Sequence, residues 1–345
     1  MCKNVLVIGN GFDLAHGLKT RYSEFLKWAY EMRTKDWKIH PKEVFRKSHP
    51  DFPNSSLLSF LLLEYEEKKA YSNWIDLEHE LEAFVQQINN FIEEDNKKVV
   101  SETVGRIRYS ISSLSKNGFT PLLRSSVSLF DAEDNRFVVK PRFRDVWGKI
   151  DKKQVYRIIG NELKELGDLF EYYLIEIEPT TRGICEKLDI VELIQPDYVI
   201  SFNYTSTICS LYKISSNDVC YIHGRLNEDN LVLGYADLNK DMDDMIFKKY
   251  YRRLVNQTDI IDFTRLYETD NIGQIIRGTI HFFGHSLDIS DEDILHPLLA
   301  DYPSVIYYMD DVDRADKVQN IIRIIGKELA EKRIRDGEID FRKIV

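Results

Sequence analysis

The sequence predicts an α/β protein whose parallel sheet is interrupted by a large, mostly helical insertion. Short apolar runs rich in β-branched and aromatic residues lie near both ends of the chain, and this composition is typical of strands buried on both faces. Between these runs, apolar residues recur at the spacing of amphipathic helices. The first run passes directly into a glycine turn, an arrangement that many α/β proteins share.

Length and charge narrow the class of protein. The chain has 345 residues, of which 43% are hydrophobic and 12% aromatic, as expected of a folded chain with a substantial core. Its net charge of −10 leaves no overall basic field. We therefore consider nucleic acid an unlikely partner, because general binding to a duplex depends on such a field.

Cysteine content and hydropathy indicate the compartment. The four cysteines include no Cys-x-x-Cys pair, and the N-terminal segment turns polar too early for a signal peptide. The most apolar run, residues 57–63, is too short to cross a bilayer. We expect a reduced, cytoplasmic protein with no cysteine-built zinc site and no membrane association.

Six apolar runs predict strands. The first covers residues 5–8 and ends at Gly9. The other five lie in the second half of the chain, at residues 198–202, 219–222, 231–233, 280–283 and 305–309. The first strand therefore needs partners about 190 residues away, and the entropy cost of closing such a loop grows only logarithmically with its length.

Helical stripes predict the elements around these strands. Thr20 is placed to cap a helix that begins near Tyr22. Longer stripes cover residues 74–92, 155–173 and 315–329, whereas residues 112–150 show no clear period and are expected to be rich in loops. We divide the chain into a sheet domain, residues 1–30 and 190–345, and a mostly helical insertion, residues 31–189.

Candidate ligand-binding residues follow the first strand. Glycine allows close approach to the backbone, and successive backbone N–H groups at such a turn bind anions. Gly9, Asn10, Gly11 and Asp13 are therefore candidates for contacts with a nucleotide. A tight turn without a ligand is the alternative. Leu14 stands where the dinucleotide fingerprint Gly-x-Gly-x-x-Gly has its third glycine, so that fingerprint is absent.

Two later strands also end in polar residues. Asn203 and Thr205 follow the run at 198–202, and His223 follows the run at 219–222. Ligands of doubly wound sheets bind beyond the carboxyl ends of the strands, where an amide can hold substrate and a histidine can act as a general base. The alternatives are structural: a helix cap for Asn203 and a core position for His223.

A fourth strand, at residues 280–283, ends in Gly284-His285-Ser286. This segment is not a nucleophile elbow, because Asp288 stands where that motif requires its last glycine. Four strand ends that all carry small polar residues predict one shared pocket at one edge of one sheet.

Other charged residues are assigned structural roles. Lys248, Lys249, Arg252 and Arg253 are typical of a solvated helix face. Glu78 lies two residues from the next glutamate, a spacing that does not place both on one face of a helix, so we expect no metal site there.

The segment from Ile8 to Phe25 resembles the AbiH family of bacterial phage abortive-infection proteins, and so do Ser201-Phe-Asn-Tyr-Thr205, His223-Gly224 and Gly284-His-Ser-Leu-Asp288. The resemblance runs in order to about residue 295 and includes residues 74–78 in the insertion. More distantly, the order of motifs is similar to that of sirtuin-like NAD-binding domains, which implies a Rossmann-like sheet. No cysteine quartet for zinc is present, so removal of acyl groups from lysine is not expected.

The sirtuin-like resemblance implies a role for each strand end. Asn203 would bind the ribose or position a water molecule, and His223 would be the base. The nucleotide-binding residues would be Gly9, Asn10, Gly11, Asp13, Thr205, Gly284, His285 and Ser286.

Together, the two resemblances imply an anti-phage protein that binds NAD and hydrolyses its nicotinamide glycosidic bond, with no metal. The expected partners are a nucleotide, further copies of the chain and a phage-derived trigger, since depletion of a shared cofactor has to be held off in uninfected cells. One alternative is a nucleotide sensor without turnover. Another is a nuclease whose metal is held by Asp13, His223 and Asp288.

Overall fold

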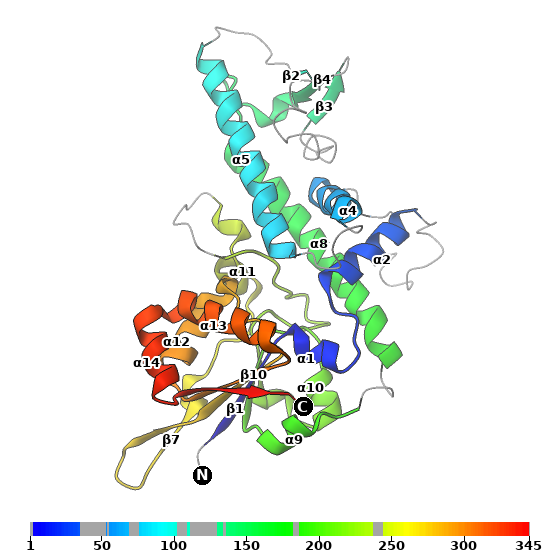
Figure 1. The fold of residues 1–345 in the computed structure, drawn as a ribbon. Helices are drawn as coiled ribbons and strands as arrows, with labels where there is room; N and C mark the ends of the chain where they lie inside the picture. The colour runs from blue at the N-terminus through cyan, green and yellow to red at the C-terminus, as the bar shows by residue number, and fades with distance from the viewer. Residues whose placement is uncertain are drawn as a thin grey trace.

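The computed structural model describes residues 3–34, 53, 55–68, 76–101, 109–110, 130–133, 136–181, 186–236 and 244–344, and every structural statement below concerns these residues. Figure 1 shows two parts: a sheet covered by helices, and a group of long helices that extends away from it. The first and last strands, β1 and β11, both lie in the sheet part (Figure 1).

The main sheet has six parallel strands in the order β11-β10-β9-β1-β5-β6. Their bounds are β1 Asn4–Ile8, β5 Tyr198–Ser201, β6 Val219–Tyr221, β9 Thr279–Phe283, β10 Ser304–Tyr308 and β11 Ile339–Lys343. Val5 of β1 is in register with Tyr198 on one side and with Ile280 on the other. The predicted pairing of the first strand with late segments, and the α/β class with a parallel sheet, are thus confirmed.

Alternate residues of β1 face two different helical layers. Val5 and Val7 pack in a cluster with helices α12 (Glu292–Asp301), α13 (Asp311–Ile325) and α14 (Lys327–Arg335). Leu6 and Ile8 pack in a second cluster with α1 (Asn10–Ala15), α9 (Asp189–Ile194) and α10 (Thr207–Tyr212). A strand of continuous apolar residues is the expected result of burial on both faces.

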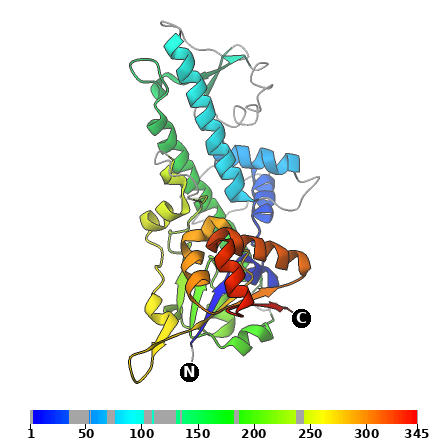
Figure 2. The same ribbon diagram turned by 60° about the vertical axis from the view of Figure 1, so that its left-hand side comes forward.

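Among the described residues, the core of the inserted part is formed by α4 (Ser56–Lys68), α5 (Leu77–Ser101) and α8 (Lys152–Thr181), joined by α2 (Tyr22–Thr34), most of which lies in the segment assigned to the sheet domain. Their apolar stripes form one cluster, and Figure 2 shows α5 and α8 running alongside each other away from the sheet. The segment from Leu226 to Phe247 contributes five buried residues to the same cluster, so the core of the insertion includes part of the sheet domain.

Four sequence predictions need correction. Residues 231–233 are buried but form no strand, since their backbone bonds to neighbouring loops, with the Val232 N–H donating to the His223 carbonyl at 2.9 Å. The predicted helix at 315–329 is broken by Gly326, whose φ of 79° ends α13 before α14 begins. Thr20 donates to the Asn10 side chain, and no cap from it to α2 is found.

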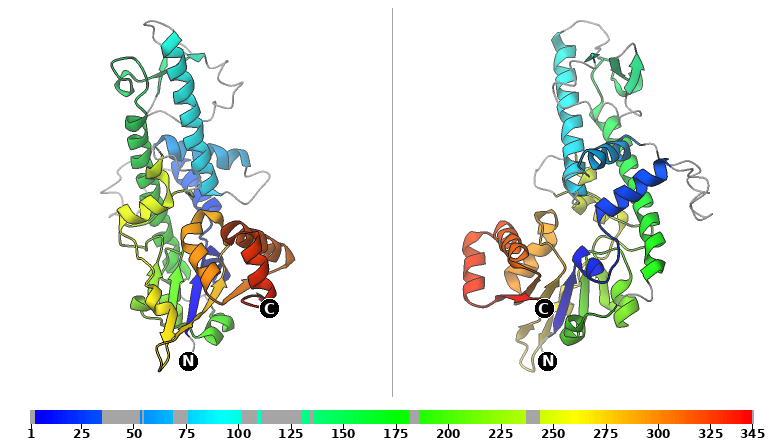
Figure 3. Two further views of the ribbon diagram at one scale, coloured as in Figure 1. Left: turned by 90° about the vertical axis from the view of Figure 1, so that its left-hand side faces the viewer. Right: turned by 45° about the vertical axis from the view of Figure 1, so that its right-hand side comes forward.

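The fourth prediction concerns residues 112–150, which were expected to be rich in loops; residues 112–129 and 134–135 of this stretch lie outside the described residues. Their described part contains β3 (Phe130–Glu133) and β4 (Arg136–Val139), which form a small antiparallel sheet with β2 (Tyr109–Ser110). Figure 3 shows this sheet at the end of the insertion far from the main sheet. The apolar run in β4, Phe137-Val138-Val139, is only three residues long and lies between charged residues, so it gave a weak strand signal.

Candidate functional site

Four strands of the main sheet end at the same edge, and the predicted site residues meet there. The ring of Phe202, which follows β5, lies 5.3 Å from the ring of His223, which follows β6, and 4.3 Å from the ring of His285, which follows β9. The Gly11 N–H donates to the Gly284 carbonyl at 2.8 Å. The strand ends therefore share one edge of the sheet, whereas the pocket predicted to lie between them stays a prediction.

The glycine turn packs against the end of β9. A Cβ atom on Gly9 would lie 2.8 Å from the Cα atom of His285, and one on Gly11 would lie 2.8 Å from the Cα atom of Gly284. Gly284 itself has a φ of +66°, and a Cβ there would lie 2.2 Å from the backbone nitrogen of Phe12. Close backbone packing thus requires these glycines whether or not a ligand is bound.

Asp13 and Thr205 bind each other. The Thr205 hydroxyl lies 2.9 and 2.8 Å from the two carboxylate oxygens of Asp13, and 2.9 Å from the Thr207 hydroxyl. Asn10 accepts a hydrogen bond from Thr20. These contacts fix α1 against the end of β5, which gives Asn10, Asp13 and Thr205 a structural role in addition to their predicted role in binding.

Asn203 has an unpaired amide. Its backbone N–H donates to the Ser201 hydroxyl at 3.2 Å, but its Nδ2 atom is buried and finds no hydrogen-bond partner among the described residues. The residue is 4% exposed. A buried donor without an acceptor is costly, so this amide is suited to a ligand oxygen.

His223 is paired with an acid. Its Nε2 atom lies 2.9 Å from Oδ1 of Asp291, which ends the 3₁₀ turn η7 (Ile289–Asp291). Burial opposes ionisation of Asp291, but the Lys249 ammonium and the His223 ring outweigh it and hold the pKa of Asp291 well below its usual range. Burial lowers the pKa of His223, and Asp291 opposes that effect.

These charges set the proton positions. At neutral pH Asp291 is ionised, so the proton of a neutral His223 ring belongs on Nε2, where it is donated to the carboxylate. The lone pair is then on Nδ1, which is suited to accept a proton. His285 differs, because its Nδ1 atom accepts the Leu287 N–H at 2.9 Å and burial lowers its pKa to about 4.

Lys249 completes the charged group. This lysine lies in α11 (Lys249–Asn256), and its Nζ atom is 3.2 Å from both carboxylate oxygens of Asp291 and 3.1 Å from the Ser290 hydroxyl. Arg253, one turn further along α11, has its Nη1 atom 4.0 Å from the same carboxylate. The predicted solvated face is wrong for Lys248, Lys249 and Arg253, which are all buried.

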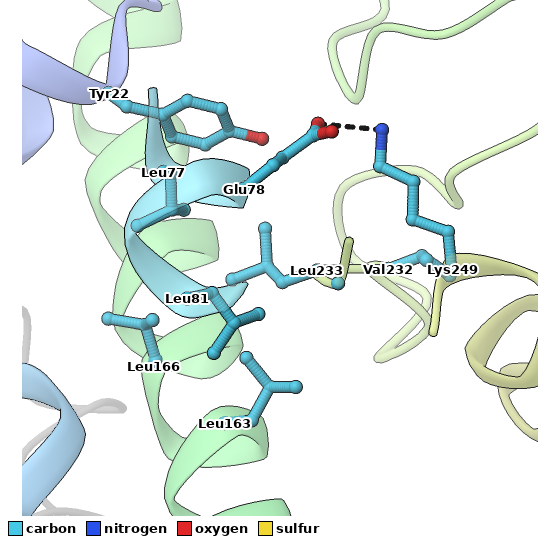
Figure 4. Close-up of a pocket in the computed structure, with 10 residues that line it drawn as sticks. Tyr22, Leu77, Glu78, Leu81, Leu163, Leu166, Val232, Leu233 and Lys249 are labelled. Carbon is cyan, nitrogen blue, oxygen red and sulfur yellow. Dashed lines mark ion pairs between the residues drawn. The ribbon is translucent and has the colours of Figure 1, made fainter. Parts of the chain in front are cut away.

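The sequence analysis missed Asp291 and the role of Glu78. The Glu78 carboxylate lies 2.6 Å from the Lys249 ammonium, and both line a pocket between the insertion and the sheet domain. Figure 4 shows the hydroxyl of Tyr22, the carboxylate of Glu78 and the amine of Lys249 pointing toward one another. The pocket has room for about one water molecule. The spacing of Lys249 and Arg253, four residues apart, was the available sign that they share a helix face.

Other predicted residues are placed as follows. Ser286 is exposed, and its carbonyl accepts from the Asn320 side chain at 3.1 Å. Asp288 caps η7 by accepting the Ser290 N–H at 2.9 Å. Within the described ranges, no three His, Cys, Asp or Glu side chains are grouped as a metal ion would need, and Asp13, His223 and Asp288 each contact a different partner. No helix in these ranges is long and apolar enough to cross a bilayer.

Comparison with known proteins identifies one family. Residues 5–308 match the family model described as bacteriophage abortive infection AbiH. The match covers the chain from β1 to β10, including the insertion. No curated protein and no solved structure matched the chain.

Proposed function

This chain belongs to the AbiH family, and membership of that family supports a role in abortive infection against phage. We propose that the protein acts in this role by hydrolysing the nicotinamide glycosidic bond of NAD. The observation that carries this proposal is the arrangement of His223, held by Asp291, and the unpaired Asn203 amide at the carboxyl edge of a parallel sheet. Ligands of such sheets bind at this edge.

The reaction suits the two side chains. The glycosidic C–N bond breaks with its electron pair on the leaving nitrogen, so cationic nicotinamide departs as a neutral molecule and the ribose carbon becomes oxocarbenium-like. The oxygen of a water molecule then bonds to this carbon, and Nδ1 of His223 takes the proton that the water loses. Positioned proton transfer of this kind is worth roughly 10² to 10⁴ in rate. Asp291 stabilises the imidazolium that forms.

Asn203 is suited to hold the sugar. An Nδ2 donor without a partner among the described residues is suited to bond a ribose hydroxyl or the attacking water. Such a bond contributes to rate if it strengthens as positive charge develops on the ribose ring. Gly284 and the glycine turn would then lie along the rest of the dinucleotide.

The small pocket supports a regulated activity. The space beside Lys249 admits about one water molecule, which is far less than a dinucleotide needs. The residues proposed to bind the nucleotide do not line this pocket, so we propose that a dinucleotide reaches the strand ends only after the insertion moves relative to the sheet. We expect a phage-derived trigger or association between copies to cause this movement, as an activity that destroys a host cofactor requires.

The second candidate function is a nucleotide sensor, for which the unpaired Nδ2 donor of Asn203 would bind a ligand without turnover. Gly9 and Gly11 are required by the end of β9 alone, so they do not by themselves imply turnover of a ligand. A sensor would bind NAD or another nucleotide at the same edge and pass the signal through the insertion.

Nicotinamide release from NAD by the purified protein, over a range of protein concentrations, tests the proposal. We expect release by the wild type and a fall of at least about 10²-fold in Asn203→Ala, His223→Ala and Asp291→Asn. His296→Ala, at an exposed position of α12, is the control and should match the wild type. NAD binding by calorimetry without release would favour the sensor, and the absence of both would overturn the NAD assignment.

A further inference from the structure

A chain of charged contacts connects the insertion with His223. Glu78 in the first turn of α5 lies 2.6 Å from Lys249, Lys249 lies 3.2 Å from both oxygens of Asp291, and Asp291 lies 2.9 Å from His223. Asp76 fixes the start of α5 by accepting the N–H of Glu78 at 3.0 Å. The position of Glu78 therefore depends on how the insertion is folded and placed.

Lys249 has to serve two carboxylates. Asp291 and Glu78 both contact its single ammonium group, and Arg253 is engaged with Asp293 as well as lying near Asp291. Burial raises the pKa of Glu78 to about 7, although Lys249 opposes this effect. If Glu78 loses its charge or moves away, the Lys249 ammonium pairs with Asp291 only. It then competes with the His223 ring for the Asp291 carboxylate.

We propose that Glu78 is a positioning residue of this site: it shares the Lys249 ammonium with Asp291 and thereby leaves the Asp291 carboxylate free to hold His223. The insertion is then part of the site, and a movement of α5 changes the chemistry of the histidine without any contact between them. The effect of Glu78 on catalysis rests on the proposed function, whereas its effect on His223 is tested without NAD.

The groups that face His223 come from several elements. Asp291 lies on η7, Lys249 and Arg253 lie on α11, and His285 follows β9. The Tyr204 ring, after β5, lies 6.4 Å from the His223 ring, and its hydroxyl is 3.1 Å from the Val232 carbonyl and 3.3 Å from the Tyr22 hydroxyl. Removal of the Glu78 charge leaves all these groups in place and adds net positive potential, so it should favour the neutral imidazole.

Histidine NMR of the full chain provides the test. The protein is labelled with ¹³C and ¹⁵N at its eight histidines, and the His223 signals are assigned from their loss in His223→Gln. Because the pKa of Glu78 is about 7, its charge is present mainly at higher pH, so we compare the proteins at about pH 8 and expect the chemical shift of the His223 Nε2–H proton to change in Glu78→Gln. Glu78→Asp keeps the charge and should stay near the wild type. Glu94→Gln, at an exposed position of the same helix, is the control.

The readout separates this role from a merely structural one. At this pH the His223 ring is neutral, and the chemical shift of its Nε2–H proton reports the bond to Asp291. No change of this shift in a folded Glu78→Gln protein would overturn the proposal. Because the shift is measured without NAD, this result is independent of whether the protein releases nicotinamide.

Discussion

Asn203 and Thr205 are two residues apart at the end of β5, and both are buried, but their polar atoms are satisfied to very different degrees. The Thr205 hydroxyl contacts both oxygens of the Asp13 carboxylate. The Nδ2 atom of Asn203 has no partner in the described part of the chain. Stability and ligand binding should therefore depend on these two side chains in opposite ways.

We predict that Asn203→Ala lowers the free energy of unfolding by less than about 1 kcal/mol, because no hydrogen bond of Nδ2 is lost. Thr205→Val keeps the shape of the side chain but removes one donor from the buried Asp13 carboxylate, so it should cost about 1–3 kcal/mol. Urea unfolding of both variants measures the difference. A larger cost for Asn203→Ala than for Thr205→Val would show that the amide has a structural partner.

At the residue scale, the sequence predicted those side chains that follow apolar strands. Asn203 and His223 stand directly after such runs, and the structure places both at the same edge of the sheet. Asp291 and Glu78 were not found, because Asp291 is the last residue of a 3₁₀ turn and Glu78 lies in the first turn of a helix in the insertion. Their place beside Lys249 results from tertiary packing, for which a single sequence has no local signal.

At the scale of elements, the junction between α1 and β9 depends on backbone contact. Gly284 packs directly on the start of α1, and its positive φ disfavours any other residue. Gly17, which follows α1, also has a positive φ, of +78°, but a Cβ there would meet nothing within 4 Å. An alanine at Gly17 would therefore measure the free-energy cost of the backbone conformation alone, whereas an alanine at Gly284 would add the cost of the steric clash.

We predict that Gly17→Ala lowers the free energy of unfolding by about 1–2 kcal/mol, the cost of a left-handed conformation. Gly284→Ala should cost more than about 3 kcal/mol, because the added methyl also forces α1 away from β9. Thermal and urea unfolding of the two variants are the measurements. Equal costs would mean that the junction yields to the extra methyl group without loss of packing.

The strands that the sequence predicted correctly are the ones that are buried on both faces of the sheet. Five of the six predicted runs are strands of the main sheet, because their β-branched and aromatic residues are buried on both faces. Strand β11 was missed, since Ile339–Lys343 alternates apolar with charged residues at the edge of the sheet. The run at 231–233 is equally apolar but is buried against helices of the insertion, which composition does not distinguish from burial in a sheet.

At the scale of the molecule, one hydrophobic cluster joins the insertion to the sheet domain. It includes the apolar stripes of α2, α4, α5 and α8 together with Leu226, Leu231, Leu233, Tyr235 and Phe247. The sequence division into residues 31–189 and the remainder stays a prediction about chain order. The shared core implies that the two parts depend on each other for stability.

Phe247 is the residue at which this dependence is best tested. Its ring is fully buried and lies 5.3 Å from the ring of Tyr156 in α8, while its carbonyl accepts the Tyr235 N–H at 3.1 Å. We predict that the wild type unfolds in a single calorimetric transition and that Phe247→Ala lowers the stability of that whole transition by about 3–5 kcal/mol. Phe263→Ala, at a position that is 41% exposed, should cost no more than about 1 kcal/mol. Two transitions, of which Phe247→Ala moves only one, would instead show that the insertion and the sheet domain unfold independently.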